Sequence, residues 1–332
     1  VHWLVFEKLG LALQPLGGGT VLLLPGLGGV LVGLMLHFWI GQERHHGVAG
    51  IMEAVALAGG RLRYQRVPAK AIAAAISIGS GASVGPEDPS VQIGANLGSM
   101  FGQKLHLSEE RLRALVAAGA ASGIAAAFNA PIAGVFFALE IILGEISGSA
   151  LGIVVLSAVT SAVFTQAVSG PEPAFQVPAY AFNSAWELPF YLGLGLLSGP
   201  VAALYVRLLY LAQDLFQRWI KLPRWARPIL AGLLVGLAGI GLPQVFGVGY
   251  ETIEKILLGE NLGLALLLAL MVAKLVLTPL SIAGGFPGGV FAPSLFIGAA
   301  LGGAFGQAAS LLFPGLAINP AAFAMVGMSA LL

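Results

Sequence analysis

Long stretches without any charged residue dominate the pattern of this 332-residue chain. A membrane-spanning helix needs about 20 consecutive apolar residues, so the longest stretches must each hold more than one helix. The uncharged windows are residues 9–42, 71–86, 114–139, 146–171, 188–206, 228–250 and 275–332. This pattern predicts an all-α polytopic membrane protein with roughly nine or ten membrane helices.

Glycine and proline interrupt the apolar windows often enough to predict short, tilted and broken helices. Pro131, Pro200 and Pro279 all lie inside such windows, and residues 71–80 are too few to cross a bilayer alone. Broken helices at membrane depth are tolerated only where protein or a water-filled cavity satisfies the backbone. That arrangement is typical of transporters and channels.

Composition supports this fold class and excludes several functions. Hydrophobic residues make up 58% of the chain and charged residues 9%, with a mean hydropathy of +0.91, whereas soluble domains carry roughly 25% charged residues. The net charge of +1 argues against a nucleic-acid partner. The lack of cysteine excludes disulfides, thiolate metal sites and cysteine nucleophiles. No Ser/His/Asp arrangement indicates an enzyme, no cofactor is expected, and Glu43, His45 and His46 lack a convincing metal-ligand pattern.

The distribution of Lys and Arg predicts the orientation in the membrane. These residues cluster at 61–70, 104–113 and 207–227, and none occurs between 114 and 206. The clusters are predicted to face the cytoplasm, with the proline-rich loop 168–188 outside. Most of these cations also suit a purely interfacial anchoring role.

An internal repeat divides the chain into two related halves. The string PSVQIGANLGSMFGQ at 89–103 matches PSLFIGAALGGAFGQ at 293–307 at ten of fifteen positions. Convergence of glycine-rich packing helices is an alternative explanation, although Pro, Ser, Phe and Gln match as well. Related halves with broken helices are typical of secondary transporters, whose site lies between the halves near the midplane.

We therefore predict a first membrane repeat at 1–170, an extracellular loop at 171–187 and a second repeat at 188–332. The chain opens with Val and stops on an apolar run. We expect both ends to be cut, and the second repeat to be incomplete at its C-terminus.

The acidic pair Glu87 and Asp88 stands out because it interrupts the approach to the first copy of the repeat. Gly85, Pro86 and Pro89 predict irregular backbone that turns into a helix around Pro89. A helix N-terminus offers unpaired N–H groups and the positive end of a dipole, which suit an anion. Glu87, itself an anion, is predicted to occupy such an anion-binding position.

These motifs resemble the CLC family of chloride channels and chloride/proton antiporters over essentially the whole chain. In that family three short segments converge on a chloride path. One is nearly intact here at residues 288–293 (GGVFAP), a second appears at 85–89 (GPEDP), and the third is degraded at 45–49 (HHGVA). The helix expected at 125–140 (AAAFNAPIAGVFFALE) is also similar to the family's helix before its inner proton site.

The resemblance implies a homodimer in the plasma or cytoplasmic membrane that carries chloride or a similar small anion, with protons as a possible second ion. Glu87 falls on the family's gating glutamate, whose carboxylate competes with chloride. Backbone N–H groups at Val290 and Phe291 fall on chloride-coordinating positions, and backbone donors suit a halide. By position, the anion-contacting residues are His46, Gly47, Val48, Gly85, Pro86, Gly289, Val290 and Phe291.

Two departures from the family pattern change the chemistry near the gate. His46 stands where the family usually has a pore-lining Ser, and it either binds an anion when protonated or forms a polar junction outside the pore. Asp88 replaces the usual Gly after the gate. It either titrates together with Glu87 or caps the helix that follows.

A third departure bears on mechanism, because Ile141 stands where proton-coupled members carry an inner glutamate. Ile cannot carry a proton, so the chain leans toward channel or uncoupled chloride conduction. An antiporter with an atypical proton path through Glu87, Asp88 and Glu140 is the alternative, although one helical step rotates a side chain by about 100°. A non-conducting remnant or an assembly subunit is the hypothesis from another class.

Overall fold

The computed structural model describes residues 18–41, 47–145, 148–180, 185–316 and 318–332. Its α-helices, in chain order, are α2 (Gly18–Met35), α3 (Gly47–Leu57), α4 (Val67–Gly79), α5 (Glu87–Lys104), α6 (Glu109–Phe128), α7 (Pro131–Phe137), α8 (Gly148–Ser169), α9 (Leu188–Asp214), α10 (Arg227–Gly241), α11 (Tyr250–Leu257), α12 (Leu264–Ala283), α13 (Phe291–Leu312) and α14 (Pro320–Leu331). Three π-helical turns, Leu36–Ile40, Ala138–Leu143 and Leu215–Trp219, extend α2, α7 and α9. The all-α prediction is confirmed.

Helix lengths confirm the predicted mixture of spanning and short helices. Pro131 starts a short helix as expected, whereas Pro200 and Pro279 lie inside the continuous helices α9 and α12 and do not break them. Six segments of the described chain are long and apolar enough to cross a membrane, and they include α6, α8, α9, α12 and α13. The nine or ten membrane helices expected from the sequence included short ones, and the described chain has three shorter apolar helices beside the six spans, among them α3 with 11 residues and α14 with 12. These apolar spans make the chain a multi-pass membrane protein.

Prolines mark where many of these helices begin. Proline occupies one of the first two positions of α4, α7, α9, α10 and α14. Its ring fixes a helical φ, and the missing N–H costs nothing in a first turn, where amides have no helical partner. The predicted start of α5 at Pro89 was two residues late, because Pro89 is the third residue of a helix that begins at Glu87.

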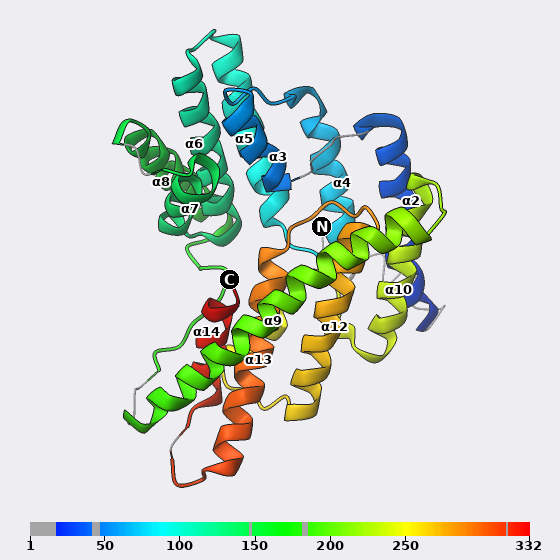
Figure 1. The fold of residues 1–332 in the computed structure, drawn as a ribbon, viewed down its shortest axis with the longest axis vertical. Coiled ribbons are helices and arrows are strands. Elements are labelled where there is room, and N and C mark those ends of the chain that lie inside the picture. The colour runs from blue at the N-terminus through cyan, green and yellow to red at the C-terminus, as the bar shows by residue number, and fades with distance from the viewer. Residues whose placement is uncertain (1–17, 42–46, 146–147, 181–184, 317) are drawn as a thin grey trace.

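Close glycine contacts join the corresponding helices of both halves. A Cβ at Gly94 of α5 would lie 2.0 Å from the carbonyl oxygen of Gly119 in α6, and a Cβ at Gly298 of α13 would lie 2.4 Å from that of Gly327 in α14. Small residues let helices approach this closely where lipid supplies no hydrophobic drive between them. Figure 1 shows the α5–α6 pair at one end of the molecule and the α13–α14 pair at the other.

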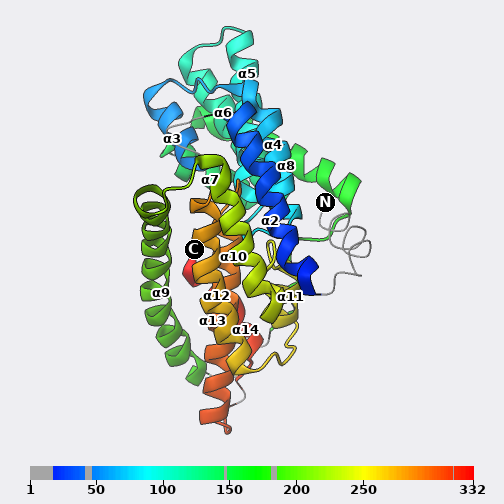
Figure 2. The same ribbon diagram turned by 90° about the vertical axis from the view of Figure 1, so that its right-hand side faces the viewer.

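Helices α2, α10 and α9 pack around the two pairs just described. In Figures 1 and 2, α2 and α10 lie side by side, again through glycine, since a Cβ at Gly232 would meet the carbonyl oxygen of Pro25 at 2.2 Å. Helix α9 crosses the face of α12 and α13 in Figure 1 and stands at one side in Figure 2. It packs against α12 and α14.

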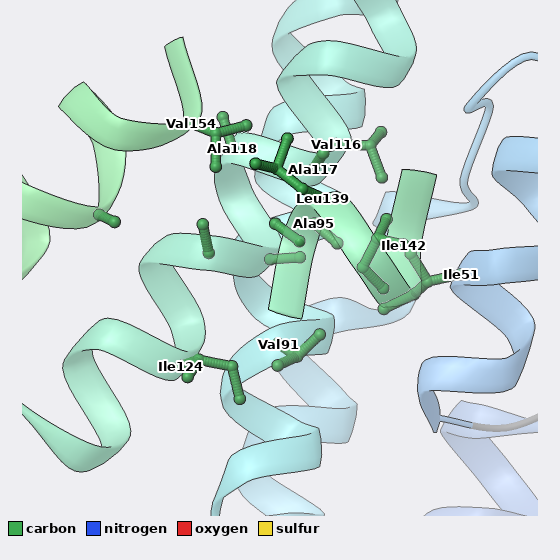
Figure 3. Packing of buried hydrophobic residues seen from close by; sticks show 14 of the residues in the cluster. Ile51, Val91, Ala95, Val116, Ala117, Ala118, Ile124, Leu139, Ile142 and Val154 are labelled. Carbon is green, nitrogen blue, oxygen red and sulfur yellow. The ribbon is translucent and has the colours of Figure 1, made fainter. Parts of the chain in front are cut away.

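The core of the first half is built from small and branched apolar side chains. Figure 3 shows Ile51 of α3, Val91 of α5 and Val116 of α6 with Leu139 of the turn after α7 and Val154 of α8. Alanines fill much of the remaining space in this cluster. A separate cluster around Phe296 and Leu270 forms the core between α11, α12 and α13.

Candidate functional site

The two halves meet where Gly85 and Gly289 exchange backbone hydrogen bonds. The N–H of Gly85 donates to the Gly289 carbonyl at 2.9 Å, and the N–H of Gly289 donates to the Gly85 carbonyl at 2.8 Å. The two residues are equivalent in the repeat register that aligns Pro89 with Pro293. Each equivalent residue makes the same bond to the other, so an approximate two-fold axis passes between them.

The equivalence extends backward into the ends of α4 and α12. Gly81 and Gly285 both adopt positive φ, 98° and 102°. The following amides reach back in the same way, from Ala82 to the Ser77 carbonyl at 3.1 Å and from Phe286 to the Ser281 carbonyl at 3.0 Å. A left-handed residue that ends a helix strongly favours glycine. Each half therefore repeats a helix, a glycine turn, an extended segment and a second helix.

The extended segments bring the N-termini of α5 and α13 close together, and the first amides of α13 have no partner within their own helix. In α13 the third residue is Pro293, which has no N–H, and the fourth, Ser294, already donates to the Val290 carbonyl at 3.0 Å. The N-terminus of α13 thus presents two amides, those of Phe291 and Ala292. In Figure 1 the ribbons of α5 and α13 run away from each other from the middle of the molecule.

The Glu87 carboxylate fills the N-terminus of α13. Its Oε1 atom accepts a hydrogen bond from the N–H of Phe291 at 2.8 Å and a longer one from that of Ala292 at 3.3 Å. The side chain is fully buried, and Oε2 has no partner among the described residues. A buried carboxylate on two helix N-terminal amides occupies the position that a free anion would favour.

Glycine makes room for this carboxylate on both sides. A Cβ at Gly85 would lie 1.9 Å from Glu87 Oε2, and a Cβ at Gly289 would lie 1.9 Å from Oε1. Neither glycine has a positive φ, so the requirement is for space and not for an unusual backbone conformation. Pro86, the N-cap of α5, follows Gly85 directly.

Val290 and Phe291 take different parts in the site. The predicted donor at Phe291 faces Glu87, and Ala292, which was not predicted, joins it. The Val290 carbonyl accepts a hydrogen bond from the Tyr205 hydroxyl of α9 at 3.3 Å. The Phe291 ring meets Phe137 edge to face, with centroids 6.0 Å apart. Sequence reasoning missed Tyr205, because α9 also carries the hydroxyls of Tyr191, Ser198 and Tyr210 and no local pattern set Tyr205 apart from them.

Asp88 reaches a different helix. Its Oδ1 atom accepts a hydrogen bond from the N–H of Val48 in the first turn of α3 at 2.8 Å, and its Oδ2 atom accepts one from Gln92 Nε2 at 2.7 Å. The interpretation of Asp88 as a cap on its own helix was wrong, because Asp88 is the second residue of α5 and its partner amide belongs to α3. Gly47 lies against the same carboxylate, which a Cβ there would meet at 2.6 Å.

The remaining predicted residues lie elsewhere. Glu140 and Ile141 are in the π-helical turn after α7, and both side chains are exposed. A shallow pocket of about 190 Å³ beside them is lined by residues that include Glu140 and Glu145. His46 lies outside the described residues, so its position relative to Gly47 and Val48 stays a prediction.

Comparison with known proteins shows which family this chain belongs to. Residues 28–332 match the family described as "Voltage gated chloride channel". The chain belongs to this family. A ClcB-like chloride channel protein of Ralstonia nicotianae is 40% identical over 94% of this chain and 73% of its own length. The CLC-f chloride channel protein of Arabidopsis thaliana is 38% identical over 94% of this chain and 42% of its length.

Relatives within the CLC family include exchangers. An H⁺/Cl⁻ exchange transporter, ClcA, of Salmonella agona is 36% identical over 82% of this chain and 59% of its own length. The chain thus spans well under two thirds of several CLC relatives. The crystal structure of a slow cyanobacterial Cl⁻/H⁺ antiporter superimposes with a TM-score of 0.85 and 26% identity, over 98% of this chain and 77% of that one.

Proposed function

We propose that this chain transports chloride or a similar small anion across a membrane, through a path in which Glu87 is the gate. The contact that supports this most directly is the 2.8 Å hydrogen bond from the N–H of Phe291 to Glu87 Oε1. A halide prefers partial positive charge from amides, which bind it without trapping it. Carboxylate and halide would therefore compete for the same two N–H groups, at Phe291 and Ala292.

We further propose channel-like or weakly coupled conduction as the transport mode. Ile141 cannot carry a proton at the position where proton-coupled members of the family have a glutamate. The alternative is chloride/proton exchange with an atypical inner site. Glu140 supports this alternative, because it is exposed in the π-helical turn one residue away.

Paired flux measurements on the purified chain in liposomes test both proposals. An outward chloride gradient should drive chloride efflux with little or no proton movement. Stoichiometric proton uptake during chloride efflux would favour the antiporter instead. A chain that moves neither ion, and in which Glu87→Gln changes nothing, would be a non-conducting subunit. Flux that persists after chelator treatment would agree with the expected lack of a cofactor or metal.

We propose a homodimer as the assembly, on family resemblance. The outward faces of α8 and α9 carry large exposed apolar side chains, among them Val163, Phe164, Leu192 and Leu196. The mass of the detergent-purified chain by light scattering tests this assembly, and a monomer at all concentrations would contradict it.

A further inference from the structure

We infer that the groove between α9 and α12, together with the basic linker that follows α9, binds one anionic phospholipid. An acyl chain of this lipid lies in the groove, and its phosphate lies on the cations of the linker. The basic linker comprises residues 215–226, which join α9 to α10. The inference does not depend on the proposed gate, because it concerns the outer surface of the helices.

The first observation is an apolar groove between α9 and α12. It has a volume of about 300 Å³, and its α9 wall consists of Leu208, Leu211, Ala212 and Leu215. Pro279 is among the residues of the α12 wall. The α9 residues follow the three- and four-residue spacing of one helix face, so the groove runs along α9 for roughly 10 Å. Because one leaflet contributes about 15 Å of hydrocarbon, the groove has a suitable length for a segment of acyl chain.

The second observation is that the groove ends at a run of cations. The basic linker carries Arg218, Lys221 and Arg224, all exposed, and no acidic residue. Among the described residues, Asp214 alone forms an ion pair with these cations, 3.5 Å from Arg218 Nε, and both side chains are exposed. Exposed ion pairs contribute little stability. Arg218 can therefore exchange this partner for a phosphate, which accepts paired hydrogen bonds from a guanidinium group.

The third observation places the lipid headgroups at the level of the basic linker. Large exposed aromatic side chains gather there, at Trp219 and Trp225 of the linker and at Phe38 and Trp39 of the turn that extends α2. That turn is in contact with the linker, and Figure 1 shows α9 crossing α12 and ending beside α2 and α10. Tryptophan is enriched at membrane interfaces, where its ring lies among the headgroups. A phosphate at this level is in reach of the linker while its acyl chain enters the groove.

Phe216 holds the basic linker against the core, close to the candidate site. Its side chain is fully buried in a cluster that contains Val84 and Phe286. Val84 directly precedes Gly85, and Phe286 lies three residues before Gly289. The cations are therefore presented by a packed turn, and a lipid bound to them lies on the layer that supports the two glycine segments.

Charge decides which class of lipid fits this surface. The cations at 207–227 are predicted to face the cytoplasm, where the leaflet carries anionic lipids. Each Lys or Arg near such a leaflet strengthens the attraction to anionic lipid by roughly fivefold, so three of them strengthen it by roughly 100-fold. A zwitterionic lipid gains little from the same cations, because its own ammonium group offsets the phosphate charge.

Native mass spectrometry of the detergent-purified full chain tests the inference, with phosphatidylglycerol and phosphatidylcholine added in separate titrations. The unmodified chain should retain one phosphatidylglycerol at concentrations at which it retains no phosphatidylcholine. Neutralising the linker should weaken phosphatidylglycerol binding by roughly 10- to 100-fold, in the triple variant Arg218→Gln, Lys221→Gln, Arg224→Gln. Equal retention of the two lipids by the unmodified chain would overturn the inference, because the cations would then only anchor the protein at the interface.

The matched control removes the same amount of charge from the other predicted cytoplasmic clusters. It is the triple variant Arg61→Gln, Lys104→Gln, Arg111→Gln, and all three side chains are exposed. This control should retain phosphatidylglycerol like the unmodified chain. If both triple variants lost the lipid to the same extent, net charge alone would explain the binding and the inference would fail.

A second pair of variants tests the groove with the cations intact. Leu211→Trp fills the groove from an exposed position and should displace the lipid, whereas Leu197→Trp, at an exposed position of α9 outside the groove, should not. Unchanged lipid retention in Leu211→Trp would contradict the inference. A change in oligomeric mass by light scattering in that variant, with lipid retention unchanged, would assign the groove to a second copy of the chain instead.

Discussion

Gly85 and Gly289 are equivalent residues of the repeat that hydrogen-bond to each other, N–H to carbonyl in both directions. This reciprocal pair fixes the extended segments before α5 and α13 against one another. As a result, Glu87, two residues after Gly85, lies against the amides of Phe291 and Ala292, which are two and three residues after Gly289. The Glu87–Phe291 contact therefore follows from the two-fold arrangement. It runs in one direction only, because residue 87 has a carboxylate that accepts hydrogen bonds and residue 291 does not.

The space beside the carboxylate gives the first prediction. Gly289→Ala places a Cβ 1.9 Å from Glu87 Oε1, so we expect the carboxylate to be pushed off the amides of Phe291 and Ala292. Chloride flux should then depend less on pH, as it should in Glu87→Gln. A double-mutant cycle checks this mechanism, because Gly289→Ala should add nothing once residue 87 is Ala. A full effect of Gly289→Ala in the Glu87→Ala background would contradict the mechanism.

Helix packing gives a prediction about stability. Gly94→Ala places a methyl group 2.0 Å from the Gly119 carbonyl oxygen, and we expect a loss of about 1–3 kcal/mol or more, as for other overpacked sites. Gly195→Ala in α9 is the matched control, since nothing lies within 4 Å of its Cβ. In a helix interior that change should be neutral or stabilising by about 0.5–1 kcal/mol. Thermal unfolding in detergent measures both, and equal Tm values for the two variants would be the contrary result.

The transport mode gives a third prediction. Ile141→Glu introduces a carboxylate at the position where the family resemblance implies a glutamate in proton-coupled members, and the exposed side chain there should tolerate it. We expect chloride-driven proton uptake to appear or to increase in liposomes, while chloride flux continues. Glu140→Gln is the companion variant: loss of proton movement in that chain alone would assign proton transfer to Glu140 and contradict the uncoupled mode.

Much of the fold followed from the sequence because the repeat preserved the residues that set helix starts and helix contacts. Pro89 and Pro293 hold the same position in α5 and α13, and the glycines at 94 and 298 make the same kind of contact. The match at residues 89–103 and 293–307 did not reveal that the equivalence reaches back to Gly81 and Gly285. The side chains in between differ, whereas their backbone hydrogen bonds are the same.

The sequence could not predict which polar groups far apart in the chain form hydrogen bonds with each other. Asp88 and Val48 are 40 residues apart, and Tyr205 and Val290 are 85 apart. No periodicity links such pairs, because they depend on how whole helices cross. An Asp in the first turn of α5 also satisfies the rule for a local cap, so local chemistry favoured the wrong partner.

The direct test of the gate is chloride flux in liposomes from about pH 4 to about pH 8, the range in which carboxylates and His titrate. Protonation removes the charge with which Glu87 competes for the Phe291 amide, so flux through the unmodified chain should rise as pH falls. Glu87→Gln should conduct at every pH with this dependence lost, while Glu110→Gln should behave like the unmodified chain. A Glu87→Gln chain whose flux keeps the original pH dependence would contradict the assignment of Glu87 as the gate.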